Sequence, residues 1–199
     1  MKLGCMATVR SGLVLSRKQA QGASEVSYPL LNLRSIKADG YIDINQLDIY
    51  KAKEYLAQEY LSQVGDVIVR LSAPYTAVLI DESTENMVVS SNFVIIRTDR
   101  HNILPEYLFW LLNTQKVKHE IYENTSSNML GAIKAKYFTE FELDLLSVKD
   151  QQKIATLNSL ARQETKLLYQ LAEEKEKYYA WTIERIYKET RRVNRNDDS

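Results

Sequence analysis

The segment Val148-Lys149-Asp150-Gln151-Gln152-Lys153-Ile154-Ala155 opens the part of the chain that decides its architecture. Residues 148–192 contain no glycine and no proline, and their apolar residues recur at helical spacing. Asp150 lies at the start of this run, where a carboxylate favours the positive end of a helix dipole. A helix of about 45 residues extends roughly 65–70 Å. Since the rest of the chain cannot bury a helix of that length, we expect the helix to require a partner helix.

A heptad frame that starts at Ile154 places an apolar seam along this predicted helix. Glu164 and Lys175 interrupt the frame at two inner positions, and the seam drifts after Tyr178. Such a seam is too polar for a buried core helix, and it fits a coiled coil with some specificity or a helix that covers a partner surface. The residues that we expect to face the partner are Ile154, Leu157, Ala161, Leu168, Leu171, Tyr178, Ile183 and Ile186.

The sequence before this helix combines short strand-like runs, turns and one clear helix. β-branched runs at residues 67–71, 76–80 and 93–97 follow turn residues, and residues 26–36 are also rich in aliphatic side chains. Their spacing of about 10–15 residues favours a curled, mainly antiparallel sheet over a βαβ array. The pattern therefore predicts an α+β domain over residues 1–147, a long helical region over 148–192 and a disordered polar tail over 193–199.

Two segments of this domain are predicted to be helical. Pro105 begins the clearer one, which continues to about residue 122, because proline in the first turn sacrifices no hydrogen bond. The apolar residues that would then face the sheet are Leu108, Leu111, Leu112 and Val117. Residues 51–61 form the second, shorter candidate.

The composition argues against several functional classes. With 45% hydrophobic and 26% charged residues, the chain has the balance of a soluble folded protein, and it lacks the roughly 18 consecutive apolar residues of a spanning helix. No apolar signal segment precedes Cys5, so we expect a cytoplasmic protein. Cys5 is the only cysteine, and the two histidines, His101 and His119, lie far apart in the sequence. The sequence therefore predicts no disulfide, no metal site and no cofactor.

No constellation of catalytic residues is apparent. Adenine methyltransferases use an Asn/Asp-Pro-Pro-Tyr/Phe loop, whereas the nearest segment here, Ser72-Ala73-Pro74-Tyr75, lacks both the amide or carboxylate and the second proline. A glycine-rich loop for phosphate or for a methionine-derived cofactor is also missing. We therefore expect a chain without catalytic activity of its own.

The net charge of +0 counts against a strongly basic nucleic-acid binder, but the distribution of charge matters more than its sum. Residues 1–24 contain Lys2, Arg10, Arg17 and Lys18 and no carboxylate. Lys134 and Lys136 form a second basic group. A binding role is therefore compatible with a neutral chain.

Five segments, read in order, resemble the specificity subunits of type I restriction-modification systems. They are Lys2-Leu3-Gly4-Cys5-Met6-Ala7-Thr8-Val9-Arg10-Ser11-Gly12, Tyr28-Pro29-Leu30-Leu31-Asn32-Leu33-Arg34-Ser35-Ile36, Val64-Gly65-Asp66-Val67-Ile68-Val69, Pro105-Glu106-Tyr107-Leu108-Phe109-Trp110-Leu111-Leu112-Asn113 and Asp150-Gln151-Gln152-Lys153-Ile154-Ala155. One departure is that the family usually has prolines just before its long helix, whereas residues 141–147 have none. That departure concerns the angle at which domain and helix join.

The resemblance implies a target-recognition domain that reads one half of a split site in double-stranded DNA. Full-length members of the family have two such domains and two long helices that pair as an antiparallel coiled coil, and this chain has one of each. Two copies that pair through their helices would form a homodimer with twofold symmetry, whose site is an inverted repeat. The partners implied are a methyltransferase (modification) subunit and a nuclease-translocase (restriction) subunit, and no membrane.

The resemblance also implies where DNA would be contacted. Arg17, Lys18, Lys134 and Lys136 are expected to neutralise phosphates. Ser16, Arg34, Asn92 and Asn128 are expected to make polar contacts near the bases.

Two alternatives stay open at the level of sequence. The chain could be a regulatory, truncated specificity fragment that acts only when it is paired with another subunit. In a different class, it could be a coiled-coil adaptor whose globular head binds protein, which the neutral charge and the Glu/Lys-rich helix would suit.

Overall fold

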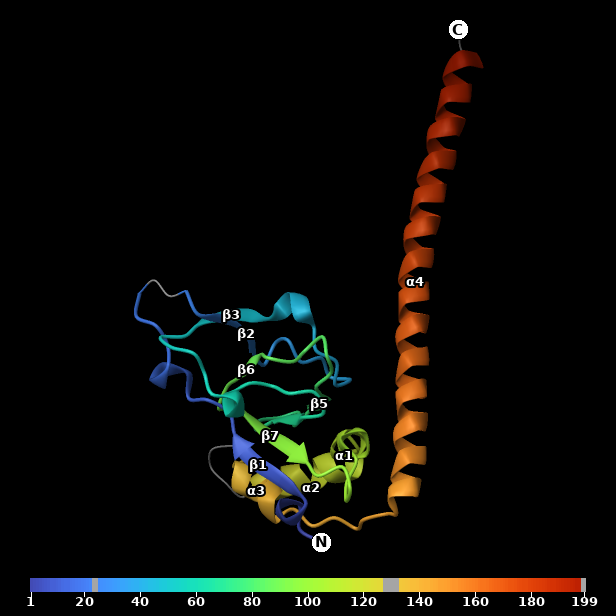
Figure 1. Cartoon of the computed structure of the whole chain (residues 1–199). Helices are drawn as coiled ribbons and strands as arrows, with labels where there is room; N and C mark the ends of the chain where they lie inside the picture. Colours follow the sequence, from blue (N-terminus) through green and yellow to red (C-terminus); the bar gives the residue numbers. More distant parts are fainter. Residues whose placement is uncertain (23–24, 127–132, 198–199) are drawn as a thin grey trace. The chain divides into compact units, whose positions relative to one another are not determined.

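Helix α4 (Val148–Asp197) is the longest element of the computed structural model, which describes residues 1–22, 25–126 and 133–197 (Figure 1). The helix begins where the sequence predicts, but it ends at Asp197 and not at Arg192, because no glycine or proline interrupts it. The chain divides into unit 1 (Met1–Ala155) and unit 2 (Thr156–Ser199). The first two turns of α4 therefore belong to unit 1, and the rest of the helix forms unit 2. Along the described ranges, no helix is both long and apolar enough to cross a membrane.

Unit 1 contains a four-stranded sheet in the order β1-β7-β4-β5, in which every neighbouring pair is antiparallel. Its strands are β1 (Ala7–Ser11), β4 (Val67–Arg70), β5 (Ala77–Leu79) and β7 (Phe93–Thr98). The predicted strands at residues 67–71, 76–80 and 93–97 are thus confirmed. The fold class, a mainly antiparallel sheet with flanking helices and a long C-terminal helix, is confirmed as well.

A second, three-stranded sheet in the order β3-β2-β6 lies beside the first. Its strands are β2 (Ser27–Leu31), β3 (Asp48–Lys51) and β6 (Val88–Val89). Strand β2 pairs antiparallel with β3 and parallel with β6. The sequence predicted the strand at β2 but did not separate its sheet from the larger one.

The four-stranded sheet is buried on both faces. Val67 and Val69 join the core cluster formed with the helices, whereas Ile68 and Ile95 join the cluster beneath the smaller sheet. Figure 1 shows this sheet between α1, α2 and α3 on one side and the three-stranded sheet on the other. Burial on both faces explains why β4 and β7 are continuous apolar runs without alternation.

Three helices cover the outer face of the large sheet: α1 (Pro105–Leu112), α2 (Gln115–Ser126) and α3 (Ala135–Glu140). The prediction of one helix from Pro105 to about residue 122 is wrong, because the helix ends before Asn113 and a second helix begins at Gln115. The Asn113 side chain accepts a hydrogen bond from Ala77 N (3.2 Å) and donates one to Ala77 O (3.0 Å), as a neighbouring strand would. Thr114 Oγ1 then accepts from Val117 N at 3.4 Å at the start of α2.

The predicted short helix over residues 51–61 is also wrong. Strand β3 ends at Lys51, and only a 3₁₀ turn, η4 (Gln58–Tyr60), follows. The backbone N–H groups of this segment donate to distant partners, Ala52 to Val26 O (2.9 Å) and Leu56 to Tyr28 Oη (3.2 Å). These tertiary hydrogen bonds take the place of helical ones.

Gln151 fixes the beginning of α4 within unit 1. Its side chain is fully buried, and Oε1 accepts from Leu104 N at 2.9 Å, directly before α1. Its Nε2 donates to Asn102 O (3.1 Å) and to Leu146 O (3.0 Å). The segment Asp150–Ala155 is therefore the attachment of the long helix to the domain that precedes it.

Candidate nucleic-acid interface

Gly12 lies where the chain after β1 crosses the connection between β6 and β7. Leu13 N donates to Val89 O (2.7 Å), and Ser91 N donates to Leu13 O (2.8 Å). A Cβ at position 12 would lie 2.2 Å from Ser90 O, closer than any real contact, so only glycine fits this crossing. The crossing holds the 3₁₀ turn η2 (Leu15–Arg17) beside the turn that contains Asn92.

Turn η2 presents polar and basic side chains on a fixed backbone. Tyr50 Oη donates to Leu15 O at 2.7 Å, which anchors the turn, and Ser16 and Arg17 are exposed. Lys18 forms an ion pair with Glu54, and the hydrogen bond to that carboxylate raises the pKa of Lys18. Arg17 is therefore more available to a phosphate than Lys18 is.

A hollow of about 370 Å³ lies next to η2. It is lined by Leu15, Leu30, Leu31, Asn32, Leu33, Arg34, Asp48, Ser90 and Asn92. Arg34 forms an ion pair with Asp48, while Asn92 is exposed. Three of the predicted base-contacting residues, Ser16, Arg34 and Asn92, thus lie at or next to one hollow. Their role at DNA stays a prediction.

The backbone of Lys51 and Lys53 lies beside residues 18–20, and the sequence reasoning missed these two lysines because it placed them in a helix. Ala20 N donates to Lys51 O (3.0 Å), and Lys53 N donates to Lys18 O (2.9 Å). Both lysine side chains are exposed, and Ala52 between them is fully buried. This alternation of exposed polar and buried residues is typical of a strand, and it could have indicated that the two lysines are exposed on one. We call Ser16, Arg17, Arg34, Lys51, Lys53 and Asn92 the η2 surface.

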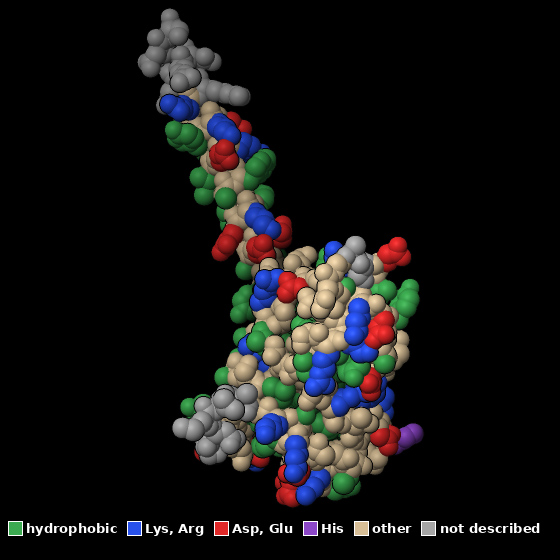
Figure 2. Space-filling view, turned by 90° about the vertical axis from the view of Figure 1, so that its left-hand side faces the viewer, with side chains coloured by type: hydrophobic (Ala, Val, Ile, Leu, Met, Phe, Trp, Pro, Cys, Tyr) green, Lys and Arg blue, Asp and Glu red, His purple; other side chains and the backbone are tan. Residues whose placement is uncertain are grey.

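The charge of the η2 surface is partly neutralised. Arg34 has a carboxylate partner, as does Lys18 beside this surface, whereas Arg17, Lys51 and Lys53 form no salt bridge within the described ranges. Figure 2 shows Lys and Arg side chains spread over one face of unit 1, with Asp and Glu side chains among them. An alternating surface of this kind suits phosphates at fixed positions better than unspecific attraction to a polyanion.

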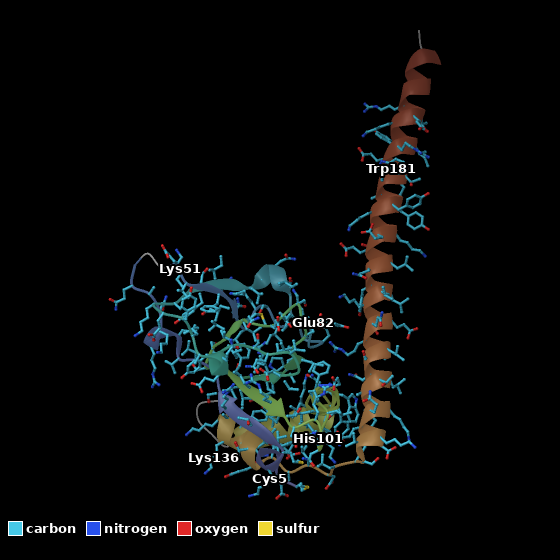
Figure 3. All side chains as sticks on the ribbon, viewed as in Figure 1. Cys5, Lys51, Glu82, His101, Lys136 and Trp181 are labelled. Carbon is cyan, nitrogen blue, oxygen red and sulfur yellow. The ribbon has the colours of Figure 1, made fainter. Side chains whose placement is uncertain are left out.

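The other predicted phosphate contacts lie elsewhere on unit 1. Lys134 precedes α3, and Lys136 lies on it, 3.5 Å from Glu140. Helix α3 packs against β1 and the 3₁₀ turn η1 (Leu3–Cys5), and Figure 3 shows Lys136 at the opposite end of unit 1 from Lys51. Asn128 lies outside the described residues. The structure therefore divides the predicted contacts into two separate groups.

The predicted partner face of α4 is mostly exposed. Leu157, Leu168, Leu171 and Tyr178 retain between 52% and 69% of their surface, and Ile183 and Ile186 are exposed too. Ala161 is exposed as well. Ile154 differs from the rest, because it packs against the core of unit 1.

A second hollow, of about 540 Å³, offers no catalytic arrangement. It is lined by Val64, Gly65, Leu79, Ile80, Asp81, Glu82, Ser83, Arg100 and Glu106. Ser83 and Thr84 donate hydrogen bonds to Asp81; burial raises the pKa of that carboxyl, but these bonds outweigh it, and the pKa is lowered. In the part of the chain that the structure describes, no three His, Cys, Asp or Glu side chains converge as metal ligands.

Comparisons with known proteins identify similar folds but no similar sequences. No family model and no curated protein matches the sequence. The HsdS subunit from Thermoanaerobacter tengcongensis matches with a TM-score of 0.65 and 15% identity, over 87% of this chain and 44% of that one. A chain from a type I R-M system, solved for its complex assembly and conformational transition, matches with a TM-score of 0.63 and 14% identity, over 88% and 45%. The type I restriction-modification system S subunit from M. genitalium matches with a TM-score of 0.50 and 12% identity, over 82% and 38%.

The chain therefore has the fold of type I restriction-modification specificity subunits, as its five sequence segments indicated. It spans less than half the length of each of these solved chains.

Proposed function

We propose that the chain is a DNA-recognition subunit of a type I restriction-modification system. In this role unit 1 reads one half of a split site in double-stranded DNA through the η2 surface. The chain directs a methyltransferase subunit, and a nuclease-translocase subunit where restriction occurs, to that site. It contributes recognition, and the other subunits contribute the chemistry.

The observation that carries the proposal is the combination of this fold with an unpaired apolar helix face. Leu168 and Leu171 are 59% and 52% exposed on a helix that continues to Asp197. Burying such a face in a second copy of the helix would supply a second recognition unit with twofold symmetry. The proposed assembly is therefore a homodimer, and its site is an inverted repeat.

A selection experiment tests this role. The purified chain, with and without its methyltransferase subunit, is used to select bound duplexes from a random double-stranded pool by gel shift. We expect enrichment of two short half-sites in inverted orientation, separated by a spacer of fixed length. If no sequence is enriched in either condition, the proposal is refuted and a protein-binding adaptor is favoured.

A matched variant sharpens the experiment. Leu171→Asp places a charge on the exposed face of α4, far in the sequence from the η2 surface, and it should leave unit 1 folded. We expect this variant to select single half-sites without a fixed spacer. Selection of the same split site by the variant would contradict pairing through α4.

A further inference from the structure

Glu164 and Lys175 are the two charged residues inside the apolar face of α4. Their neighbours three and four positions away are apolar throughout. Around Glu164 these are Leu160, Ala161, Leu167 and Leu168, and around Lys175 they are Leu171, Ala172, Tyr178 and Tyr179. Since only residues three or four positions apart meet on a helix surface, neither charge can find an opposite charge within its own helix.

Several other charges of this helix have partners within it. Lys177 pairs with Glu173 (3.0 Å) and Glu174 (2.9 Å), and Lys188 pairs with Glu184 (2.5 Å). Glu164 and Lys175 form no salt bridge among the residues that the structure describes. Both side chains are exposed. Two opposite charges are therefore left without partners on the face that should be covered.

We propose that two copies of α4 pair antiparallel in one register, in which Glu164 of each copy faces Lys175 of its partner. This inference rests on the proposed homodimer and adds its register. The same alignment places Leu168 opposite Leu171 and Ala161 opposite Tyr178, so that leucines meet each other and a small residue meets a large one. The twofold axis passes between Tyr169 and Gln170, and the charge pair occurs twice.

Other alignments of the same two helices leave the charges unmatched. A shift by one heptad in one direction sets Glu164 against Leu168, and a shift in the other direction sets Lys175 against Leu171. A parallel, in-register pair sets Glu164 against Glu164. Each of these alternatives covers a charge with an apolar or like-charged residue, which is costly. Polar residues at inner positions are a known means of fixing the register of a coiled coil.

The register has a geometric consequence. Ala155, the last residue of unit 1, lies between 14 and 15 residues before the axis. At about 1.5 Å per residue, the two copies of Ala155 lie about 44 Å apart along the helix axes.

Charge exchange tests the register. Glu164→Lys and Lys175→Glu each convert two attractive pairs into two repulsive ones, and sedimentation equilibrium of the full chain measures the dimer Kd. We expect each single variant to raise the Kd about tenfold or more. The double variant Glu164→Lys/Lys175→Glu, which has the native net charge, should return the Kd to near the original value. An equimolar mixture of the two single variants should form a heterodimer of near-original affinity.

Glu176→Lys is the matched control, because it makes the same charge change one position outside the predicted seam and should leave the Kd unchanged. Far-UV circular dichroism checks that every variant keeps its helix content. If the original chain dimerises but the single variants dimerise equally well, or if the double variant does not recover, the register is wrong while the homodimer stands. If the original chain remains a monomer at all concentrations, the homodimer itself is wrong, and this register is wrong with it.

Discussion

Unit 1 and the helix of unit 2 use the same residue types in opposite ways. Leu108 and Leu112 of α1 are fully buried, whereas Leu168 and Leu171 of α4 are more than half exposed. Asp66 is buried with both oxygens bonded to Arg97, whereas Glu164 has no partner in the described helix. Unit 1 buries the two α1 leucines and pairs Asp66 within itself, whereas in the described helix Leu168 and Leu171 are exposed and Glu164 is without an ion-pair partner. We therefore expect substitutions in unit 1 to act on folding and substitutions on the exposed face of α4 to act on the proposed assembly.

The largest effect should come from the buried charge of unit 1. Asp66→Ala leaves the Arg97 guanidinium and Gln63 N without their acceptor, and because Arg97 is 32% exposed we expect the lower end of the range for a broken buried pair, about 3 kcal/mol. We expect this loss in the free energy of unfolding, measured with urea by the fluorescence of Trp110 in a Trp181→Phe background. Glu174→Ala breaks an exposed ion pair of α4 and should leave the midpoint unchanged. Equal losses of stability from the two substitutions would contradict the distinction between the buried ion pair of unit 1 and the exposed ion pair of α4.

A substitution at the Gly12 crossing should cause the next largest loss of stability. Gly12→Ala forces a methyl group against Ser90 O and Val89 O, which are backbone atoms, and overpacking of this kind costs about 3 kcal/mol at the upper end of its usual range. Gly22→Ala is the matched control, because an added Cβ there meets nothing within 4 Å. Thermal unfolding compares the two variants. A Gly12→Ala variant as stable as the original would contradict the close crossing that positions η2.

The attachment of α4 to unit 1 predicts a smaller loss. Gln151→Ala removes three hydrogen bonds to backbone groups and leaves Leu104 N unpaired, which should cost about 2 kcal/mol. The nearby Lys149→Ala changes an exposed side chain of the same helix turn and serves as the control. Hydrogen exchange at Leu104 and at the first turn of α1 measures the effect locally. Unchanged protection in the Gln151→Ala variant would show that this side chain does not hold the joint.

The smallest effect concerns single phosphate contacts. Arg17→Ala and Lys51→Ala should each weaken binding to every DNA sequence alike and lower the salt slope of binding by about one. Lys116→Ala, an exposed lysine of α2 outside both predicted groups, is the control. If Lys134→Ala lowers the slope while Lys51→Ala does not, the interface lies at α3 and not at the η2 surface.

The sequence predicted elements well where burial dominates. β4 and β7 are continuous apolar runs, and the glycine-free segment after residue 147 forms the expected helix. The sequence-based prediction failed where hydrogen bonds to residues distant in the sequence replace helical ones. The Asn113 side chain ends the helix after Leu112 by forming hydrogen bonds with Ala77. The backbone N–H groups of Ala52 and Leu56 donate hydrogen bonds to residues distant in the sequence.

The candidate site was predicted only in part, for a similar reason. Ser16, Arg34 and Asn92 come together because Gly12 permits two backbones to cross, and that crossing follows from no periodicity in the sequence. Lys51 and Lys53 were hidden by the mistaken helix, and Lys134 and Lys136 are basic in sequence but lie apart in space. The distribution of charge along the sequence thus predicts that a basic surface exists better than it predicts which residues form that surface.

Sequencing of methylated bases in the host genome, with the gene for this chain intact and deleted, tests whether the chain directs methylation to a split site. We expect a methylated motif of two inverted half-sites with a fixed spacer that disappears on deletion and returns with the original gene. A methylation pattern that does not change on deletion, or a lost motif that is undivided, would contradict this role.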